Sequence, residues 1–272
     1  MNTNSYFTIE ILSTGSLYLF KSAADAPDAT FYYWVNSFPN AARDNYTGSI
    51  TLTDTSAQYI TISIGDKVRF YRAETTRLNA SEADGVGSVR LRCTADCNFT
   101  GNMASLIGFS ESIPTYCFRY MFYQTKVIDA SKLELPWTTL STWCFGRMFQ
   151  GCTSLVKAPE LKDVTTATQC YQWMFINCSN LSYIKCMQKT LSANTFTNWV
   201  QNVASTGTFI KDKDTEWNTG NSGIPTGWTV KNMNPQVQSL DFNDATAVYI
   251  KGNQKIVKIY GQNGTVLWEE NT

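Results

Sequence analysis

Histidine is absent from the 272 residues of the chain, and this absence bears directly on chemistry. The imidazole side chain is the commonest general acid or base near neutral pH and the commonest metal ligand in proteins. Its absence excludes every catalytic triad that depends on histidine and argues against ordinary hydrolytic or metal-dependent catalysis. We therefore expect no enzymatic activity, no catalytic residues, no metal site and no cofactor.

Net charge is also missing, because 22 lysine and arginine residues are balanced by 22 aspartate and glutamate residues. A neutral chain without a basic cluster lacks the electrostatic attraction that a nucleic-acid backbone or an anionic membrane surface provides. No apolar run approaches the roughly 20 residues that a membrane-spanning helix needs. We expect neither nucleic-acid binding nor membrane insertion.

The features of a secretory signal are missing from Met1–Phe20, which has no basic flank, no continuous apolar core and no small-residue cleavage site. Between Tyr6 and Leu12, polar residues interrupt the apolar ones at every second position, which predicts a strand. We therefore expect a protein that is made and folded in a cytoplasm. If it works outside a cell, a route other than the general secretory pathway must carry it there.

Residues 1–104 contain short alternating or β-branched runs, separated by clusters of Ser, Asp, Gly, Pro and Asn. Runs of this length and spacing predict about six or seven strands, packed as a small N-terminal β-sandwich. The runs are Ser5–Lys21, Thr30–Val35, Gly48–Thr53, Tyr59–Arg72 and Ser88–Cys97.

The middle of the chain repeats. A Cys–aromatic–x–x–Met–Phe pattern begins at Cys117, Cys144 and Cys170, which are 27 and 26 positions apart. Three matches in nearly constant register indicate a true repeat. A period of this length is typical of solenoids, in which stacked units bury apolar residues that one unit cannot bury alone.

Within each unit, the spacing of Cys, Met and Phe predicts one or two helical turns. The segment that follows is too short and Pro-bounded for a helix, so we expect an extended strand or arc there. After the repeats, Asn194–Val203 has apolar residues at helical spacing, with Asn194 or Thr195 as the N-cap, which predicts a capping helix. The predicted fold is mainly β with an α/β solenoid, in which residues 105–232 form a short leucine-rich-type repeat array.

Residues 233–272 are expected to form a small C-terminal β-meander. The predicted strands are Val248–Ile250, Gln254–Tyr260 and Thr265–Trp268. Gly252-Asn253 and Asn263-Gly264 stand at the expected turns, and the second pair is a preferred hairpin turn. Met233–Gln236 resembles a linker in front of this module.

The eight cysteines invite a disulfide or zinc interpretation. Cys144 and Cys152, like Cys170 and Cys178, are eight positions apart, which matches no usual zinc spacing. Their constant place in the repeat favours small buried apolar side chains with free thiols, and disulfides are the alternative. The pair Cys93 and Cys97 is ambiguous, because on one strand both side chains would point to the same face.

Two carboxylates carry the remaining enzyme hypothesis, a glycan-processing activity. Glu134 and Glu160 occupy equivalent positions in the repeat, so we expect them to stack as neighbours. A glycosidase needs two carboxylates in different environments on opposite sides of a substrate gap. The repeat therefore argues against this activity.

The candidate binding residues are those that vary between units while the apolar pattern stays fixed. Tyr120, Arg147 and Trp173 each come three positions after a repeat cysteine, and Tyr116 and Trp143 come directly before one. Large aromatic and arginine side chains at variable positions suit stacking on sugar rings or on a protein surface. The alternative is that these side chains only cover neighbouring units or the β-domain.

The repeats resemble those of the BspA-like leucine-rich repeat proteins of gut Bacteroidetes and their bacteriophages. Cys144–Leu161 matches the family's unit almost throughout, and the third unit matches as far as Leu181. The first unit departs from the pattern, since Gln124–Val127 stands where the others have Gly-Cys-Thr-Ser or its equivalent. The C-terminus, Ile256–Glu269, resembles a short module of phage tail and fibre proteins.

The resemblance implies a surface-displayed binding protein, and the missing signal peptide favours a virion. We expect a phage fibre, tail or decoration protein on the virion surface that binds a host-surface glycan or protein or takes part in assembly. Other virion proteins, or copies of itself in a homo-oligomer, are the expected partners. The alternative is a bacterial cell-surface leucine-rich repeat adhesin whose secretion signal lies outside this sequence.

Overall fold

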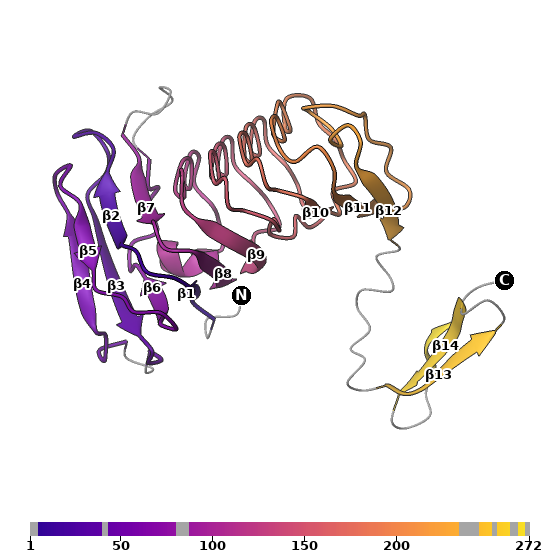
Figure 1. Ribbon diagram of the computed structural model, residues 1–272, viewed down its shortest axis with the longest axis horizontal. Coiled ribbons are helices and arrows are strands. Elements are labelled where there is room, and N and C mark those ends of the chain that lie inside the picture. The colour runs from indigo at the N-terminus through magenta and orange to yellow at the C-terminus, as the bar shows by residue number, and fades with distance from the viewer. Residues whose placement is uncertain are drawn as a thin grey trace. The chain divides into compact units, whose positions relative to one another are not determined.

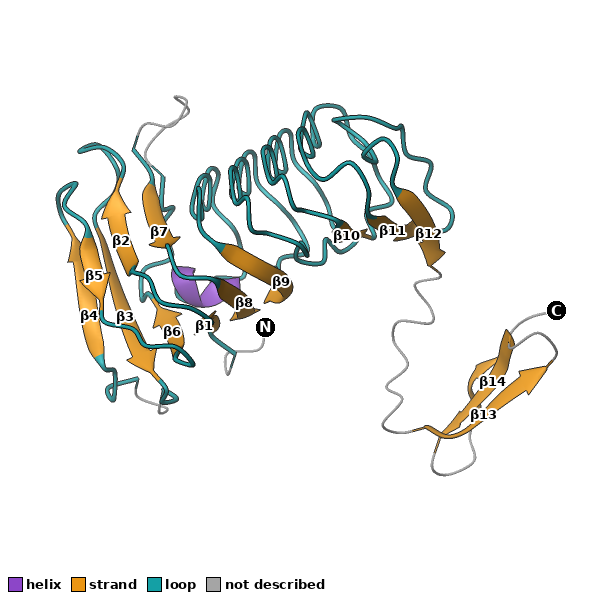
Figure 2. Ribbon diagram, in the orientation of Figure 1, coloured by secondary structure: helices purple, strands orange, loops and turns teal. Residues whose placement is uncertain are grey.

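In a computed structural model, the chain is built almost entirely of strands and turns (Figure 1, Figure 2). The structure describes residues 5–39, 43–79 and 87–233, and the backbone of three further strands between 245 and 269. The chain divides into two compact units, residues 1–231 and 232–272, which are described separately. The only helical element in the described residues is a short 3₁₀-helix, η1 (Met103–Ile107). The prediction of a mainly β protein is confirmed.

Two sheets occupy the N-terminal part of the first unit, and each of the five predicted runs contains at least one strand. The strands are β1 (Phe7–Ile11), β2 (Leu17–Lys21), β3 (Ala29–Val35), β4 (Gly48–Leu52), β5 (Gln58–Ile60), β6 (Lys67–Tyr71), β7 (Val89–Cys93) and β8 (Cys97–Asn102). One sheet has the order β5-β2-β7, and the other has the order β4-β3-β6-β1-β8-β9, where β9 (Val127–Glu134) comes from the repeat region. Side chains alternate between buried and partly exposed along β2 and β7, and the buried ones from both sheets belong to one hydrophobic core.

Strand β8 joins this region to the repeats. It pairs antiparallel with β1 on one side and parallel with β9 (Val127–Glu134) on the other. Phe99 of β8 lies 5.2 Å from Phe7, 4.6 Å from Phe122 and 6.4 Å from Phe149, measured between ring centroids. A single hydrophobic core therefore continues across residue 104, where the sequence analysis placed a domain boundary.

Four turn segments stack beside one another after this junction, as Figure 2 shows. We define the turn ladder as residues 116–125, 143–152, 169–178 and 194–203. The predicted helical turns are absent from it, and so is the predicted capping helix at Asn194–Val203, because all four segments are runs of turns. The fourth segment repeats the first three, with Thr195 in the place of the repeat cysteine and Trp199 in the place of methionine.

The backbone of the turn ladder explains why no α-helix forms there. In every segment a residue with positive φ recurs at each fourth position, as at Tyr116, Tyr120 and Gln124, which breaks the i→i−4 hydrogen bonding of a helix. Alternate N–H groups instead bond within the segment and to the next one. Met121 N donates to Phe118 O (3.1 Å), whereas Phe122 N donates to Met148 O of the next segment (3.0 Å). Both sets of buried donors are thereby satisfied.

Aromatic rings form two interior columns through the stacked segments. In the first column, the rings of Phe118, Phe145 and Tyr171 are stacked in nearly parallel planes, with centroids 6.1 and 5.9 Å apart and interplanar angles of 6° and 9°. In the second column, Phe149 lies 5.4 Å from Phe122 and 5.7 Å from Phe175. Offset stacking of this kind adds to the burial that holds the segments together.

The opposite side of the stack is a set of parallel strands and bridges. β10 (Tyr183–Cys186), β11 (Thr208–Asp212) and β12 (Thr229–Met233) form a three-stranded sheet, and β10 and β11 are parallel. Lys157 bridges β9 to β10, because it pairs with Asp129 on one side and with Tyr183 on the other. Strands are present at the predicted extended segments of the first and third units, and the second unit has isolated bridges at Lys157 and Leu161.

The second unit contains a three-stranded antiparallel meander, as predicted. Its strands are β13 (Ala245–Lys251), β14 (Lys255–Gly261) and β15 (Val266–Glu269), in the order β13-β14-β15. The turns predicted at Gly252-Asn253 and Asn263-Gly264 lie outside the described residues, as does most of the predicted linker at Met233–Gln236.

Candidate functional site

All five predicted binding residues lie in the turn ladder, at positions where the backbone is left-handed. Their φ angles are 60° at Tyr116, 61° at Tyr120, 58° at Trp143, 56° at Arg147 and 54° at Trp173. Residues other than glycine, asparagine and aspartate rarely adopt this backbone conformation, and residues with bulky side chains adopt it least of all.

The structure brings these residues together in a row along the ladder. Trp143 stacks on Tyr116 of the preceding segment, with centroids 6.4 Å apart and an angle of 22°. On its other side, Trp143 lies 5.6 Å from Trp173 of the following segment. Equivalent positions in stacked segments are neighbours, so a variable position in sequence becomes a continuous row in space.

Guanidinium groups lie between the rings of this row. The Cζ atom of Arg147 is 3.9 Å from the ring centroid of Trp173 and 5.4 Å from that of Tyr120. Arg119 was not among the predicted residues, yet its Cζ lies 4.4 Å from the ring of Trp143 and 5.3 Å from that of Tyr120. At these distances the aromatic quadrupole attracts the cation. We call these six side chains the aromatic–arginine row: Tyr116, Arg119, Tyr120, Trp143, Arg147 and Trp173.

Gly146 makes room for this stacking. A Cβ atom at this position would lie 2.3 Å from Cε3 of Trp143, so the indole ring rests directly over the glycine backbone. Gly146 occupies the position that Arg119, Gln172 and Thr197 hold in the other segments. Glycine occurs at this repeat position in the second segment alone. This glycine is the signal in the sequence from which a ring packed against the backbone could have been inferred.

Exposure differs along the row. Tyr116 and Tyr120 are each 6% exposed, Trp143 is 9% exposed and Arg119 is 1% exposed. Arg147 and Trp173 are half-buried. The rings therefore cover neighbouring units, as the alternative interpretation of these residues supposed, and the accessible part of the row is at Arg147 and Trp173.

The eight cysteines are all buried with free thiols in the structure, which confirms their predicted burial. Cys152 and Cys178 occupy the same repeat position, and each Sγ donates a hydrogen bond of 3.0 Å to a backbone oxygen of the preceding segment, Phe122 O and Phe149 O. Cys93, at the end of β7, and Cys97, at the start of β8, are hydrogen-bonded to one another, which lowers the pKa of Cys93 and raises that of Cys97.

The two carboxylates considered in the sequence analysis are both at least partly exposed to solvent. Glu160 accepts a hydrogen bond of 3.1 Å from Lys185 Nζ, and Glu134 lies exposed at the end of β9. Within residues 5–39, 43–79 and 87–233, no group of three or more His, Cys, Asp or Glu side chains is placed to hold a metal ion. No helix in the described part of the chain has the length and apolar character needed to cross a membrane.

Comparison of the chain with protein-family models, with curated proteins and with solved structures finds no match.

Proposed function

We propose that this chain is a non-enzymatic structural protein on the surface of a phage virion, which attaches to a host-surface glycan or protein. In this proposal the N-terminal region is a β-sandwich and the stacked units form a short solenoid of leucine-rich type. The C-terminal meander joins the chain to other virion proteins or to further copies of itself. The solenoid assignment is supported by the hydrogen bonds from each turn segment to the next and by the parallel bridges on the opposite side.

The observation that carries the binding proposal is the choice of residues at the left-handed positions. In the fourth turn segment these positions are held by Asn194, Asn198 and Asn202, a residue type that tolerates this backbone well. The first two segments have bulky side chains of the aromatic–arginine row at their first two left-handed positions, and the third segment has Trp173 at its second. Backbone strain of about 1 kcal/mol per residue persists chiefly where a function requires it.

The virion role is tested by mass spectrometry of purified phage particles. We expect peptides of this chain at a copy number that matches other structural proteins. Absence of the chain from the particles would contradict the virion role. Recovery of it from the outer surface of bacterial cells would instead support the alternative, a cell-surface adhesin of the same binding chemistry.

The binding role is tested with a substitution that the chain itself provides. Trp173→Asn gives the third segment the residue that the fourth has at Asn198, and asparagine suits the left-handed backbone better than tryptophan does. We expect this variant, and Arg147→Asn, to remain folded by thermal unfolding and to lose binding on an array of host-surface glycans and proteins.

The matched control is Tyr59→Asn, which removes an exposed ring, 66% accessible, from β5 outside the row. It should bind like the unaltered protein. Unchanged binding by the Trp173 and Arg147 variants would show that the row serves packing alone.

A further inference from the structure

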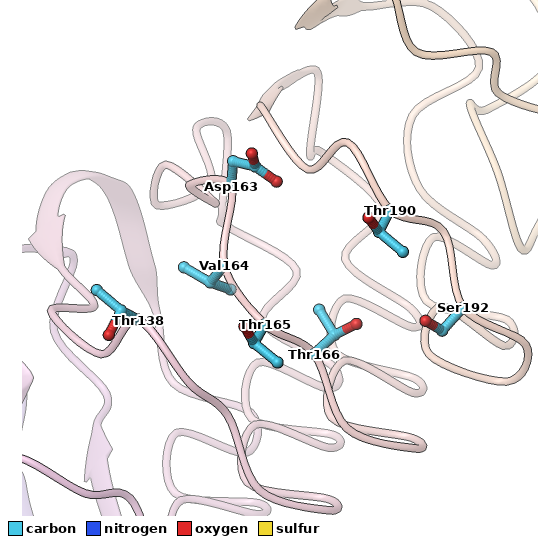
Figure 3. Close-up of a pocket in the computed structure, with 7 residues that line it drawn as sticks. All are labelled: Thr138, Asp163, Val164, Thr165, Thr166, Thr190 and Ser192. Atoms are coloured by element: carbon cyan, nitrogen blue, oxygen red, sulfur yellow. The ribbon is translucent and has the colours of Figure 1, made fainter.

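A polar pocket of about 440 Å³ lies on a part of the array that the sequence analysis did not single out (Figure 3). Three successive units contribute to it, since Thr138 precedes the second turn segment, Asp163–Thr166 precede the third, and Thr190 and Ser192 precede the fourth. The backbone there is fixed between units, because Thr165 N donates to Thr138 O (2.9 Å) and Leu140 N donates to Thr165 O (2.8 Å). The pocket is therefore held by the same cross-unit bonding as the rest of the stack.

Hydroxyl groups dominate the lining of this pocket. Five of its seven lining residues carry one, and Val164 is the single apolar member. Within the described residues, none of these five hydroxyls is hydrogen-bonded to another part of the chain, so each is available to a ligand. The five are Thr138, Thr165, Thr166, Thr190 and Ser192.

Charge in and around the pocket disfavours an anionic ligand. Asp163 contributes a carboxylate that is fixed in place, because its Oδ1 accepts a hydrogen bond of 3.0 Å from Lys189 N. The ammonium group of Lys189 lies 4.0 Å from Asp163 and 3.9 Å from the buried Asp212, so two carboxylates share it. The lining contains no lysine or arginine and one apolar residue, so an uncharged, hydroxyl-rich molecule is the complementary ligand.

A second pocket, of about 180 Å³, shares the lining residue Ser192 with the first. It adds an aromatic ring, Trp217, and the amide side chains of Asn194 and Asn218. The Nε1 donor of Trp217 is buried and has no hydrogen-bond partner in the described residues. Because this N–H group is closed off from solvent, the ring of Trp217 and the two amides are the groups that this pocket offers to a ligand.

We propose that the two pockets form one groove that binds a neutral oligosaccharide. One sugar unit bonds to the hydroxyls and to Asp163 in the larger pocket, and the next lies against Trp217 and the two asparagines. A sugar has several hydroxyl donors and acceptors around its ring, and its C–H groups form an apolar face. This combination matches hydroxyl, carboxylate and amide groups beside an indole. This inference rests on the proposed attachment function and names its ligand class, but it places the ligand away from the aromatic–arginine row.

The test is a calorimetric titration of the full chain with four probes, the linear tetrasaccharides of glucose, galactose, mannose and N-acetylglucosamine. We expect at least one of them to bind. Thr165→Val and Thr190→Val keep the side-chain shape and remove one hydrogen bond each, so each should weaken that binding by about five- to tenfold. Asn218→Ala, which removes an exposed amide group from the smaller pocket, should weaken it by a similar factor.

The matched control is Thr61→Val, which removes an exposed threonine hydroxyl in the loop between β5 and β6. It should bind like the unaltered chain, and all four variants should unfold at similar temperatures. Binding of none of the four probes would overturn the groove, and so would wild-type affinity in all three groove variants.

The groove and the proposed function fail in different ways. If the groove variants retain affinity while the Trp173 and Arg147 variants lose it, the groove is rejected and attachment through the row stands. If the groove variants lose affinity but the chain is absent from virions, the groove stands and the virion role fails.

Discussion

At the scale of single residues, the cysteines show how the stack changes ordinary side-chain chemistry. Burial raises the thiol pKa of four of them from 9.0 to about 12, namely Cys117, Cys152, Cys170 and Cys186. A thiol that stays protonated is a poor nucleophile and a poor metal ligand. The repeat cysteines therefore act as small apolar side chains that pack between segments.

These raised pKa values predict a loss of stability in alkali. In the unfolded chain the thiols ionise near pH 9, whereas in the folded chain they stay protonated until about pH 12. Between these values the folded state binds more protons, so the free energy of unfolding falls as pH rises, by about 1.4 kcal/mol per pH unit for each thiol. Urea unfolding under reducing conditions at pH 8 and pH 10.5 measures this difference.

Cys186→Ala provides the comparison for this experiment, because it removes one such thiol. Its stability should fall less steeply with pH than that of the unaltered chain, by the contribution of one group. Equal slopes for the two proteins would mean that the Cys186 thiol ionises alike in both states.

At the scale of elements, strands were predictable from sequence and the turn ladder was not. Alternation of apolar and polar residues is visible in a run such as Val89–Cys93, and the structure has β7 there. In Asn194–Val203, by contrast, Phe196, Trp199 and Val200 have the spacing that an α-helix would give. A turn every fourth residue gives nearly the same spacing, so the apolar pattern alone cannot separate the two.

A signal for the turns was nevertheless present. Asn194, Asn198 and Asn202 recur at every fourth position, and Gly151 and Asn177 hold the place of Asn202 in the preceding segments. Asparagine and glycine at such intervals indicate left-handed residues. The bulky members of the row hid this signal in the first three segments. Their stacking also depends on contacts between segments, such as that of Trp143 with Gly146, which no local pattern contains.

The left-handed positions predict a stabilising substitution. Gln169 has a φ of 61° and is only partly buried, so Gln169→Asn should relieve backbone strain and raise the free energy of unfolding by roughly 0.5 kcal/mol. Chemical denaturation of the two proteins measures the change. Gln201→Asn is the matched control, because Gln201 lies in the same kind of segment at a position where φ is not positive, and it should give no gain. A gain of equal size at both positions would contradict the explanation by backbone conformation.

At the scale of the molecule, the sheet that contains β8 and β9 makes residues 1–231 a continuous structure. Alternating strand runs give way to the repeat after residue 104, which is why a boundary was predicted there, but neither pattern reveals that β8 pairs with strands on both sides. The core contacts of Phe99 reach β1 through Phe7 and the turn ladder through Phe122 and Phe149. Because of these contacts, we expect a loss of packing in the N-terminal sheets to lower the stability of the repeats, and the reverse.

This coupling predicts how a change at the junction spreads. Phe99 is fully buried, so Phe99→Ala should lower the stability of the first unit by about 3–5 kcal/mol. Because one core is shared, hydrogen exchange measured by mass spectrometry should become faster in both β1 and the turn ladder. The free energy of opening that is calculated from the exchange rates should fall by the same amount in both. Phe31→Ala is the comparison variant, because Phe31 is a buried ring in β3, away from the junction in the sheet order. If residues 1–231 unfold cooperatively, this variant should also make hydrogen exchange faster in both regions. If Phe31→Ala accelerates exchange in the N-terminal sheets and leaves the turn ladder protected, the two regions unfold separately. The predicted boundary near residue 104 would then divide two units of different stability, joined by β8.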